Sequence, residues 1–336
     1  MEKIDSLYKI GCRNFAIFFD DIKIKDGLNQ ALFLNKVSRL LKKKYFNVNH
    51  LITVPTDYTL LYMIDSEDKM NNYTSDFVNN LDKDIIVLYT GDKVISDGIC
   101  EKNYTKAFNI YKNNLGIWWN YPVNDFLESN LALGAIEKLP KKNINYIFFN
   151  PMRQPQLSKI SLATGADFSY NPKNYNPDKS WNNAIEKQFG KNAEAMKIFA
   201  IHSRHMANNK SQVGPPDAPE FYSIAHQAVL DTKLNKNHNF SSIIKLIDEM
   251  EKFADTLLKN LQQKILSECK FQLEQFKRII KAVRIAVKSL QEKKLDNDLK
   301  YLRQNIDDYK SQAMISEKSA VKFIDEVIEL FKYLIV

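Results

Sequence analysis

The stretch NFAIFFDDIKIKDG, residues 14–27, decides the fold and raises the functional question. An apolar run from Phe15 to Phe19 ends at two adjacent carboxylates, Asp20 and Asp21. A run without polar alternation is typical of a parallel strand that is covered on both faces. Adjacent aspartates are ordinary residues of a turn or a helix N-cap, and they are also the residue type of a catalytic pair. Their relation to the other strand ends distinguishes the two interpretations.

Four more apolar segments repeat this pattern along the chain. The five begin about 30 to 36 residues apart, and segments with three- and four-residue apolar spacing lie between them. Strands and helices that alternate at this period predict a series of βα units in an α/β fold. The predicted strands are Phe15–Phe19, Leu51–Val54, Ile85–Tyr89, Gly116–Trp119 and Tyr146–Phe149, and the predicted helices are Leu32–Tyr45, Tyr104–Asn114 and Leu157–Phe168.

The pattern changes beyond about residue 215. The segment KSQVGPPDAPE, residues 210–220, breaks helices and predicts a domain boundary. Long amphipathic patterns over residues 241–266, 271–291 and 319–336 follow it, with no strand pattern among them. We therefore predict two domains, a βα domain over residues 1–210 and an α-helical bundle over residues 218–336.

Composition excludes several classes of protein. The net charge is +8, but acidic residues interleave with the basic ones throughout, so no nucleic-acid partner is predicted. Cys12, Cys100 and Cys269 lie far apart, and no carboxylate stands at ligand spacing from His202 and His205, so no metal site is predicted. The sequence has no run of 18 apolar residues, which predicts no membrane span.

Polar and aromatic side chains follow every predicted strand. In a βα barrel the carboxyl ends of the strands form the active site, so these side chains are expected to line one pocket. Taken singly, each has an ordinary structural explanation, and the joint pattern carries the prediction. The residues are Asp20 and Asp21 after the first strand, Tyr58 after the second, Thr90 after the third, Trp118, Asn120 and Asp125 at and after the fourth, and Asn150 after the fifth.

Several of these segments together resemble glycoside hydrolase family 84, which contains bacterial β-N-acetylglucosaminidases, animal O-GlcNAcases and proteins named hyaluronidases. The resemblance covers about residues 5 to 210 and rests on five segments. They are FAIFFDDI, LITVPTDY, LGIWWNYPVND, NPMRQPQLSKISLATGADFSYNPKNY and SWNNAIEKQFG. It implies a (β/α)8 TIM barrel with a helical bundle after it. Here the barrel is expected to be partial, with about five βα units that correspond to units 4–8.

The resemblance implies a retaining hydrolase in which the 2-acetamido group of the substrate is the nucleophile and an oxazoline is the intermediate. Asp20 would orient the acetamido N–H, and Asp21 would be the general acid and then the general base. Two neighbouring carboxylates push their pKa values apart, which suits this division of roles.

The other matched positions would bind the sugar. By resemblance, Tyr58 reaches the acetamido group and the anomeric centre, while Trp118 and Val54 enclose the acetamido methyl. Asn120 bonds near the acetamido group or the leaving oxygen, and Asp125 and Asn150 hold sugar hydroxyls. Thr90 is retained in the third loop, where Tyr89 and the pair Asp92-Lys93 depart from the family pattern.

Only about a dozen residues precede the strand that carries the aspartates, whereas the family has three βα units there. We therefore expect a fragment of a catalytic domain whose missing segment is encoded upstream, with uncertain activity alone. The alternatives are a barrel that a separate polypeptide completes and a decayed enzyme. The expected partner is a GlcNAc-containing glycan or glycoprotein, and no cofactor is expected. No signal peptide is visible, which predicts a cytoplasmic chain as written and an extracellular one if an upstream segment is missing, since bacterial relatives are often secreted.

Two alternatives to the hydrolase stay open. A binding-only or inactive fragment that recognises GlcNAc would keep Trp118, Asn120, Asp125 and Asn150 and would tolerate loss of the acid. A helical interaction module would rest on the bundle alone and would need none of the strand-end residues. The presence of both Asp20 and Asp21 favours the hydrolase.

Overall fold

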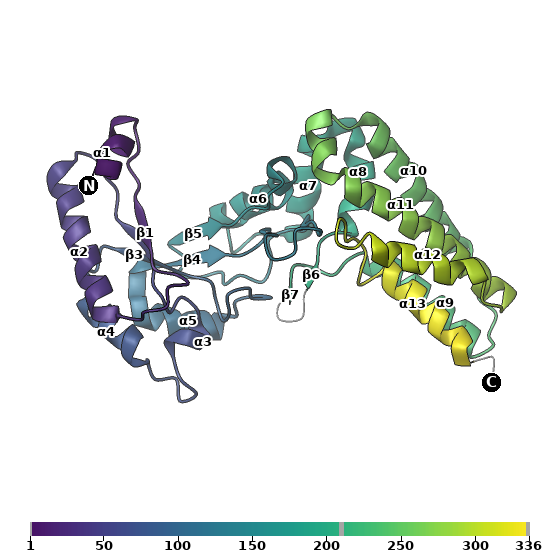
Figure 1. Cartoon of the computed structure of the whole chain (residues 1–336), viewed down its shortest axis with the longest axis horizontal. Helices are drawn as coiled ribbons and strands as arrows, with labels where there is room; N and C mark the ends of the chain where they lie inside the picture. Colours follow the sequence, from purple (N-terminus) through teal and green to yellow (C-terminus); the bar gives the residue numbers. More distant parts are fainter. Residues whose placement is uncertain (1, 208–211, 334–336) are drawn as a thin grey trace. The chain divides into compact units, whose positions relative to one another are not determined.

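The structure is a computed structural model that describes residues 2–207 and 212–333 (Figure 1). The chain forms two compact units. The first comprises Met1–Asn120 and Lys138–Asn150, and the second comprises Tyr121–Glu137 and Pro151–Val336. These two units are not the two domains predicted from the sequence, residues 1–210 and 218–336. The predicted domain boundary stays a prediction.

The first unit is built on a five-stranded parallel sheet with strands in sequence order. All five predicted strands are confirmed to within two residues at either end. They are β1 (Ala16–Phe18), β2 (Ile52–Val54), β3 (Ile86–Tyr89), β4 (Leu115–Trp119) and β5 (Tyr146–Phe149). Five parallel strands with helices between them, followed by a helical C-terminal region, confirm the predicted fold class of a partial α/β barrel.

Burial differs between the middle and the edges of this sheet. All four residues of β3 are buried, and β2 and β4 are mostly buried. Phe18 in β1 and Phe148 in β5 are instead 45% and 38% exposed. The prediction that each strand is covered on both faces is therefore wrong for β1 and β5, because each of them pairs with a single neighbouring strand.

The helices of the first unit precede or lie between its strands. They are α1 (Glu2–Lys9), α2 (Gly27–Lys44), α3 (Leu60–Met63), α4 (Asn72–Asn80), α5 (Glu101–Tyr111) and the 3-10 turn η1 (Lys112–Asn114). Asp26 starts α2 by accepting the N–H of Asn29 at 3.0 Å. Gly27 allows α2 to approach α4 closely, since a Cβ at that position would lie 2.3 Å from the carbonyl oxygen of Tyr73.

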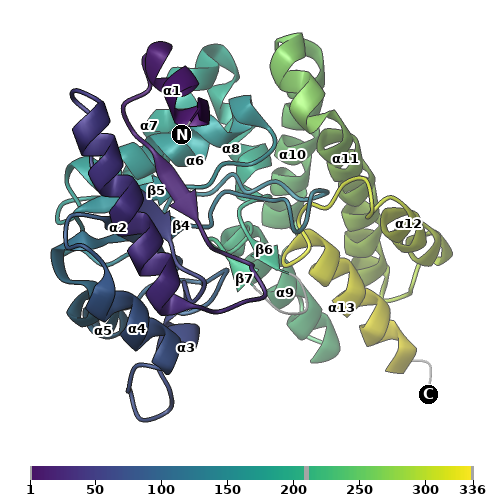
Figure 2. The same ribbon diagram turned by 60° about the vertical axis from the view of Figure 1, so that its left-hand side comes forward.

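The second unit is mainly helical. Its elements are α6 (Pro155–Tyr170), α7 (Pro177–Phe189), η2 (Gly190–Asn192), α8 (Ala193–Ile201), the two-stranded pair β6 (Met206–Ala207) and β7 (Gln212–Val213), and the helices α9 (Pro219–Lys233), α10 (Ser241–Asn260), α11 (Gln263–Glu292), α12 (Asn297–Asp308) and α13 (Ala320–Tyr333). Helix α11 packs against α10, α12 and α13, and it lies alongside α10 in both views (Figure 1 and Figure 2).

The apolar stripe predicted for residues 241–266 forms the inner face of α10. Its buried members include Ile243, Ile247, Met250 and Leu257. The pattern is interrupted at Leu261 and Gln262, where α10 ends and α11 begins. None of the helices in the described parts of the chain is long and apolar enough to cross a membrane.

Candidate active site

The Asp20–Asp21 pair lies in a turn directly after β1. The strand end is fixed to β2, because Phe19 donates its N–H to the carbonyl oxygen of Val54 at 2.8 Å. Asp21 has φ +55°, a left-handed conformation that aspartate tolerates better than most residues. Both carboxylates are exposed. The turn removes the alternation of a regular strand, which would send two adjacent side chains to opposite faces.

Tyr58 binds Asp21 directly. Its hydroxyl donates a hydrogen bond to Asp21 Oδ1 at 2.9 Å, and its side chain is buried except for 7% of its surface. Burial, followed by the hydrogen bond to Asp21, raises the pKa of Tyr58 well above its usual value, and the charge on Asp20 adds to this rise. The phenol therefore stays neutral and acts as a hydrogen-bond donor at physiological pH.

Trp118, Asn120 and Asn150 form a second group, at the ends of β4 and β5. Asn120 Oδ1 accepts from Trp118 Nε1 at 3.0 Å and from Asn150 Nδ2 at 3.1 Å. Asn120 Nδ2 donates to the carbonyl oxygen of Val94 at 2.7 Å. One amide thus orients an indole ring, a second amide and the loop after β3.

Apolar contacts place these two groups on the same sheet. Trp118 packs against the core cluster that contains Val54 and Tyr58. Its ring also meets the ring of Phe18 edge to face, with centroids 5.6 Å apart. Side chains from β1, the β2 end and β4 therefore lie together, which is the arrangement that a pocket across adjacent strand ends requires.

Thr90 is buried, and its hydroxyl and its N–H both form hydrogen bonds within the protein. Its hydroxyl donates to the carbonyl oxygen of Lys93 at 2.8 Å, and its N–H donates to the carbonyl oxygen of Tyr58 at 3.0 Å. This residue holds the loop after β3 and the backbone of Tyr58. Asp125 lies in the second compact unit, where its carboxylate is exposed, so its part in the pocket stays a prediction.

Sequence reasoning missed Asp57, although it stands inside the segment LITVPTDY. Asp57 is completely buried and accepts from Lys25 Nζ at 2.5 Å and from Asn71 Nδ2 at 2.7 Å. An aspartate after a strand ordinarily reads as an exposed turn residue. The sequence feature that could have identified Asp57 was its position directly before Tyr58.

Metal-binding groups are absent from the residues that the structure describes: no three His, Cys, Asp or Glu side chains gather there. The pair His202 and His205 does not lie on a helix face, because α8 ends at Ile201. His202 is buried against Ser316 Oγ, at 2.5 Å from Nδ1, and burial lowers its pKa to about 3. It is a neutral core residue.

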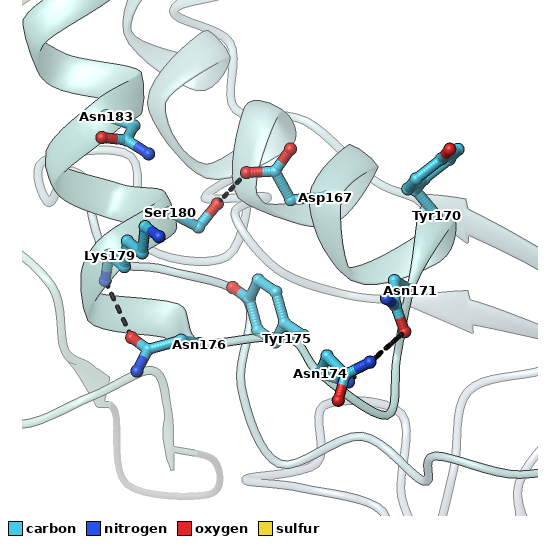
Figure 3. A pocket seen from close by; sticks show the side chains of 9 residues that line it. All are labelled: Asp167, Tyr170, Asn171, Asn174, Tyr175, Asn176, Lys179, Ser180 and Asn183. Atoms are coloured by element: carbon cyan, nitrogen blue, oxygen red, sulfur yellow. Dashed lines mark hydrogen bonds between the residues drawn. The ribbon is translucent and has the colours of Figure 1, made fainter.

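The second unit holds a separate polar pocket of about 240 Å³ between the end of α6 and the start of α7 (Figure 3). Several of its groups bind one another: Ser180 Oγ donates to Asp167 Oδ2, and Asn176 Oδ1 accepts the N–H of Lys179. Tyr170 is 93% exposed at its rim. Water reaches such exposed groups freely, so the pocket has no orphaned buried group that calls for a ligand.

A parallel βα sheet with a carboxylate pair, a buried phenol and a Trp–Asn group at its strand ends is an arrangement that βα-barrel glycoside hydrolases use. A family model described as beta-N-acetylglucosaminidase matches residues 1–201, and one described as hyaluronidase post-catalytic domain-like matches residues 230–324. The chain belongs to the β-N-acetylglucosaminidase family, glycoside hydrolase family 84, as its sequence segments predicted.

Known relatives agree with this membership. The chain is 28% identical over 174 residues to the protein O-GlcNAcase of Rattus norvegicus, covering 48% of this chain and 19% of the relative. The solved structure of CpGH84B is 32% identical with a TM-score of 0.89, over 97% of this chain and 59% of that one. An O-GlcNAc hydrolase variant from Thermobaculum terrenum shares the fold at 21% identity, with a TM-score of 0.77 over 99% of this chain and 75% of that one. The chain thus spans about a fifth of the curated relative's length.

Proposed function

We propose that this chain supplies the catalytic pair of a retaining β-N-acetylglucosaminidase that hydrolyses terminal β-linked GlcNAc from glycans or glycoproteins. The observation that supports this proposal is the hydrogen bond between the Tyr58 hydroxyl and Asp21 Oδ1, in the turn that also carries Asp20. This hydrogen bond holds Asp21 through Oδ1, and Asp21 Oδ2 has no hydrogen bond among the residues that the structure describes. The family membership supports the reaction class.

In the first proposed step, the acetamido oxygen of the substrate attacks the anomeric carbon as the bond to the leaving oxygen breaks. Asp21 gives its proton to the leaving oxygen, and Asp20 accepts a hydrogen bond from the acetamido N–H, whose nitrogen becomes positively charged in the oxazoline. Water then attacks the anomeric carbon and gives a proton to Asp21, while the bond from that carbon to the oxazoline oxygen breaks and restores the acetamido group. The product is GlcNAc with retained configuration.

We propose binding roles for the remaining residues, which their contacts support. Trp118 and Val54 present apolar surface for the acetamido methyl, and they pack in the cluster that contains Tyr58. Asn150 keeps its amide oxygen free for a sugar hydroxyl while its Nδ2 binds Asn120. Asp125 is proposed to hold a second hydroxyl, on the family resemblance alone. Thr90 acts through the backbone of Tyr58.

The test compares Asp21→Asn and Asp20→Asn on β-GlcNAc glycosides whose leaving groups differ in pKa. Asp21→Asn should lower kcat about 10² to 10⁴-fold for poor leaving groups, the usual contribution of a general acid, and much less for a nitrophenyl group. Asp20→Asn should lower kcat for every leaving group alike, because it acts on ring closure.

Asp76→Asn is the matched control, since Asp76 is an exposed carboxylate on α4, away from the strand ends. Equal sensitivity of the two active-site variants across leaving groups would contradict the assigned roles. A wild-type chain that binds GlcNAc without releasing the chromophore would instead support the binding-only alternative.

A further inference from the structure

The loop from Phe19 to Asp26, which carries the aspartate pair, is tied to the segment after β2 at three points. Thr56 Oγ1 donates to the carbonyl oxygen of Phe19 at 2.9 Å, where the loop begins. Tyr58 binds Asp21 in its middle, and Asp57 binds Lys25 near its end. Neighbouring residues of a single segment, residues 56–58, therefore hold the loop before, at and after the aspartates.

The loop has little apolar packing of its own. Ile22 and Ile24, the apolar side chains between Asp21 and Lys25, are 42% and 78% exposed. Polar contacts must therefore fix its conformation. Among the loop contacts that the structure describes, the Lys25–Asp57 pair is the one that joins opposite full charges.

Asp57 is suited to be the fixed end of this contact. Its side chain is fully buried, whereas that of Lys25 is 53% exposed. Burial of a carboxylate is unfavourable unless charged and hydrogen-bonding partners compensate it. Asn71 supplies the second partner, and Asn71 is itself fixed because its Oδ1 caps α4 by accepting the N–H of Thr74 at 2.7 Å. Asp57 is thus linked through Asn71 to the start of helix α4.

We propose that Asp57, held by Asn71, acts with Lys25 as a positioning clamp that keeps Asp21 in hydrogen-bond contact with Tyr58. This inference rests on the proposed catalytic role of the aspartate pair. In the proposed reaction, Asp57 and Lys25 contact no reacting atom. Because Asp57 directly precedes Tyr58, the clamp fixes the loop and the Tyr58 phenol relative to one another. A shift of about 1 Å at a catalytic group typically costs on the order of 10²-fold in rate.

The kinetic test uses the full chain with Lys25→Met. The clamp predicts a fall in kcat of about 10- to 100-fold with KM changed much less, as for other residues that orient catalytic groups. Lys25→Arg keeps the cation and should restore most of the rate. Lys23→Met is the matched control, because Lys23 is an exposed lysine of the same loop with no side-chain partner among the described residues. It should leave kcat unchanged.

A second measurement needs no catalysis. A carbon-13 label at tyrosine Cζ reports hydrogen bonding of each phenol, and Tyr58→Phe identifies the Tyr58 resonance. The clamp predicts that Lys25→Met moves this resonance and that Lys23→Met and Lys25→Arg do not. A Tyr58 resonance that stays at its wild-type position in Lys25→Met would overturn the clamp, whether or not the chain hydrolyses GlcNAc glycosides. Absence of hydrolysis by the wild-type chain would bear on the proposed function alone and would leave this test of the clamp unchanged.

Discussion

Replacement of Asn120 by alanine should destabilise the strand-end group more than any other single amide change at the site. Asn120→Ala removes three hydrogen bonds, those with Trp118, Asn150 and the carbonyl oxygen of Val94. Each bond contributes about 0.5 to 1.5 kcal/mol net. Because the freed groups are only partly buried and water reaches some of them, we expect a loss of about 1.5 to 3 kcal/mol in the free energy of unfolding.

Urea denaturation measures this loss as a change in midpoint at constant slope. Asn150→Ala is the matched comparison, because it removes one of the three bonds and should cost about 0.5 to 1.5 kcal/mol. Trp118→Phe keeps an aromatic ring and deletes the indole donor. A double-mutant cycle of Trp118→Phe with Asn120→Ala should therefore give a coupling free energy of about 0.5 to 1.5 kcal/mol.

Two results would refute the reasoning. If Asn120→Ala costs no more than Asn150→Ala, Asn120 does not join three partners. If the cycle gives no coupling, the indole N–H does not bind the amide. Either outcome would also remove the reason for expecting Asn120 to orient Trp118 and Asn150 toward a sugar.

Two further changes test the structure away from the aspartates. Burial raises the pKa of Asp217 to about 7, against the opposing effect of the N–H groups of Arg204 and His205. The folded state therefore holds a proton that the unfolded state has released, so this group's stabilising contribution falls as pH rises from about 4 to 7. Asp217→Asn should gain stability relative to wild type between pH 4.5 and 7.5, and a constant difference in urea midpoint would contradict this. Gly27→Ala should destabilise by about 1 to 3 kcal/mol through overpacking against α4. A stabilised variant, which helix propensity alone predicts, would show that the α2–α4 approach is looser.

The sheet could be predicted from the sequence because its strands are short apolar runs with polar ends. The last strand, Tyr146–Phe149, coincides with β5 residue for residue. Helix boundaries were harder to predict. The pattern placed the start of α2 at Leu32, whereas the helix begins at Gly27, and the overlooked signal was the N-cap Asp26.

Shorter elements had no periodic signature to detect. Helix α3 has four residues, and each strand of the β6–β7 pair has two. Elements of this length depend on their neighbours. Thr59, for example, caps α3, whose Leu60 N–H binds the carbonyl oxygen of Gly91 in the loop after β3. Such contacts join residues that are distant in sequence, which a single-sequence pattern does not encode.

The candidate site likewise contains residues that the sequence predicted and one that it did not. Residue type and position at a strand end predicted that Asp21 and Tyr58 would share a pocket, since parallel strands end at one edge of a sheet. Asp57 escaped prediction because its burial depends on Lys25, 32 residues earlier in the chain. A buried aspartate and an exposed one look alike in a sequence until the partner is known.

Stability and the proposed catalysis should therefore depend on partly different residues of the first unit. The central strands β2, β3 and β4 are buried among apolar side chains, so substitutions there change the free energy of unfolding. The loop that carries Asp20 and Asp21 is mostly exposed, and its conformation depends on contacts of Phe19, Asp21 and Lys25 with residues 56–58. Loss of one such contact removes little buried apolar surface but moves a group proposed to be catalytic. Lys25→Met leaves the buried carboxylate of Asp57 without its cation, so it should lower the unfolding free energy as well as kcat, and Asn120→Ala should also affect both quantities.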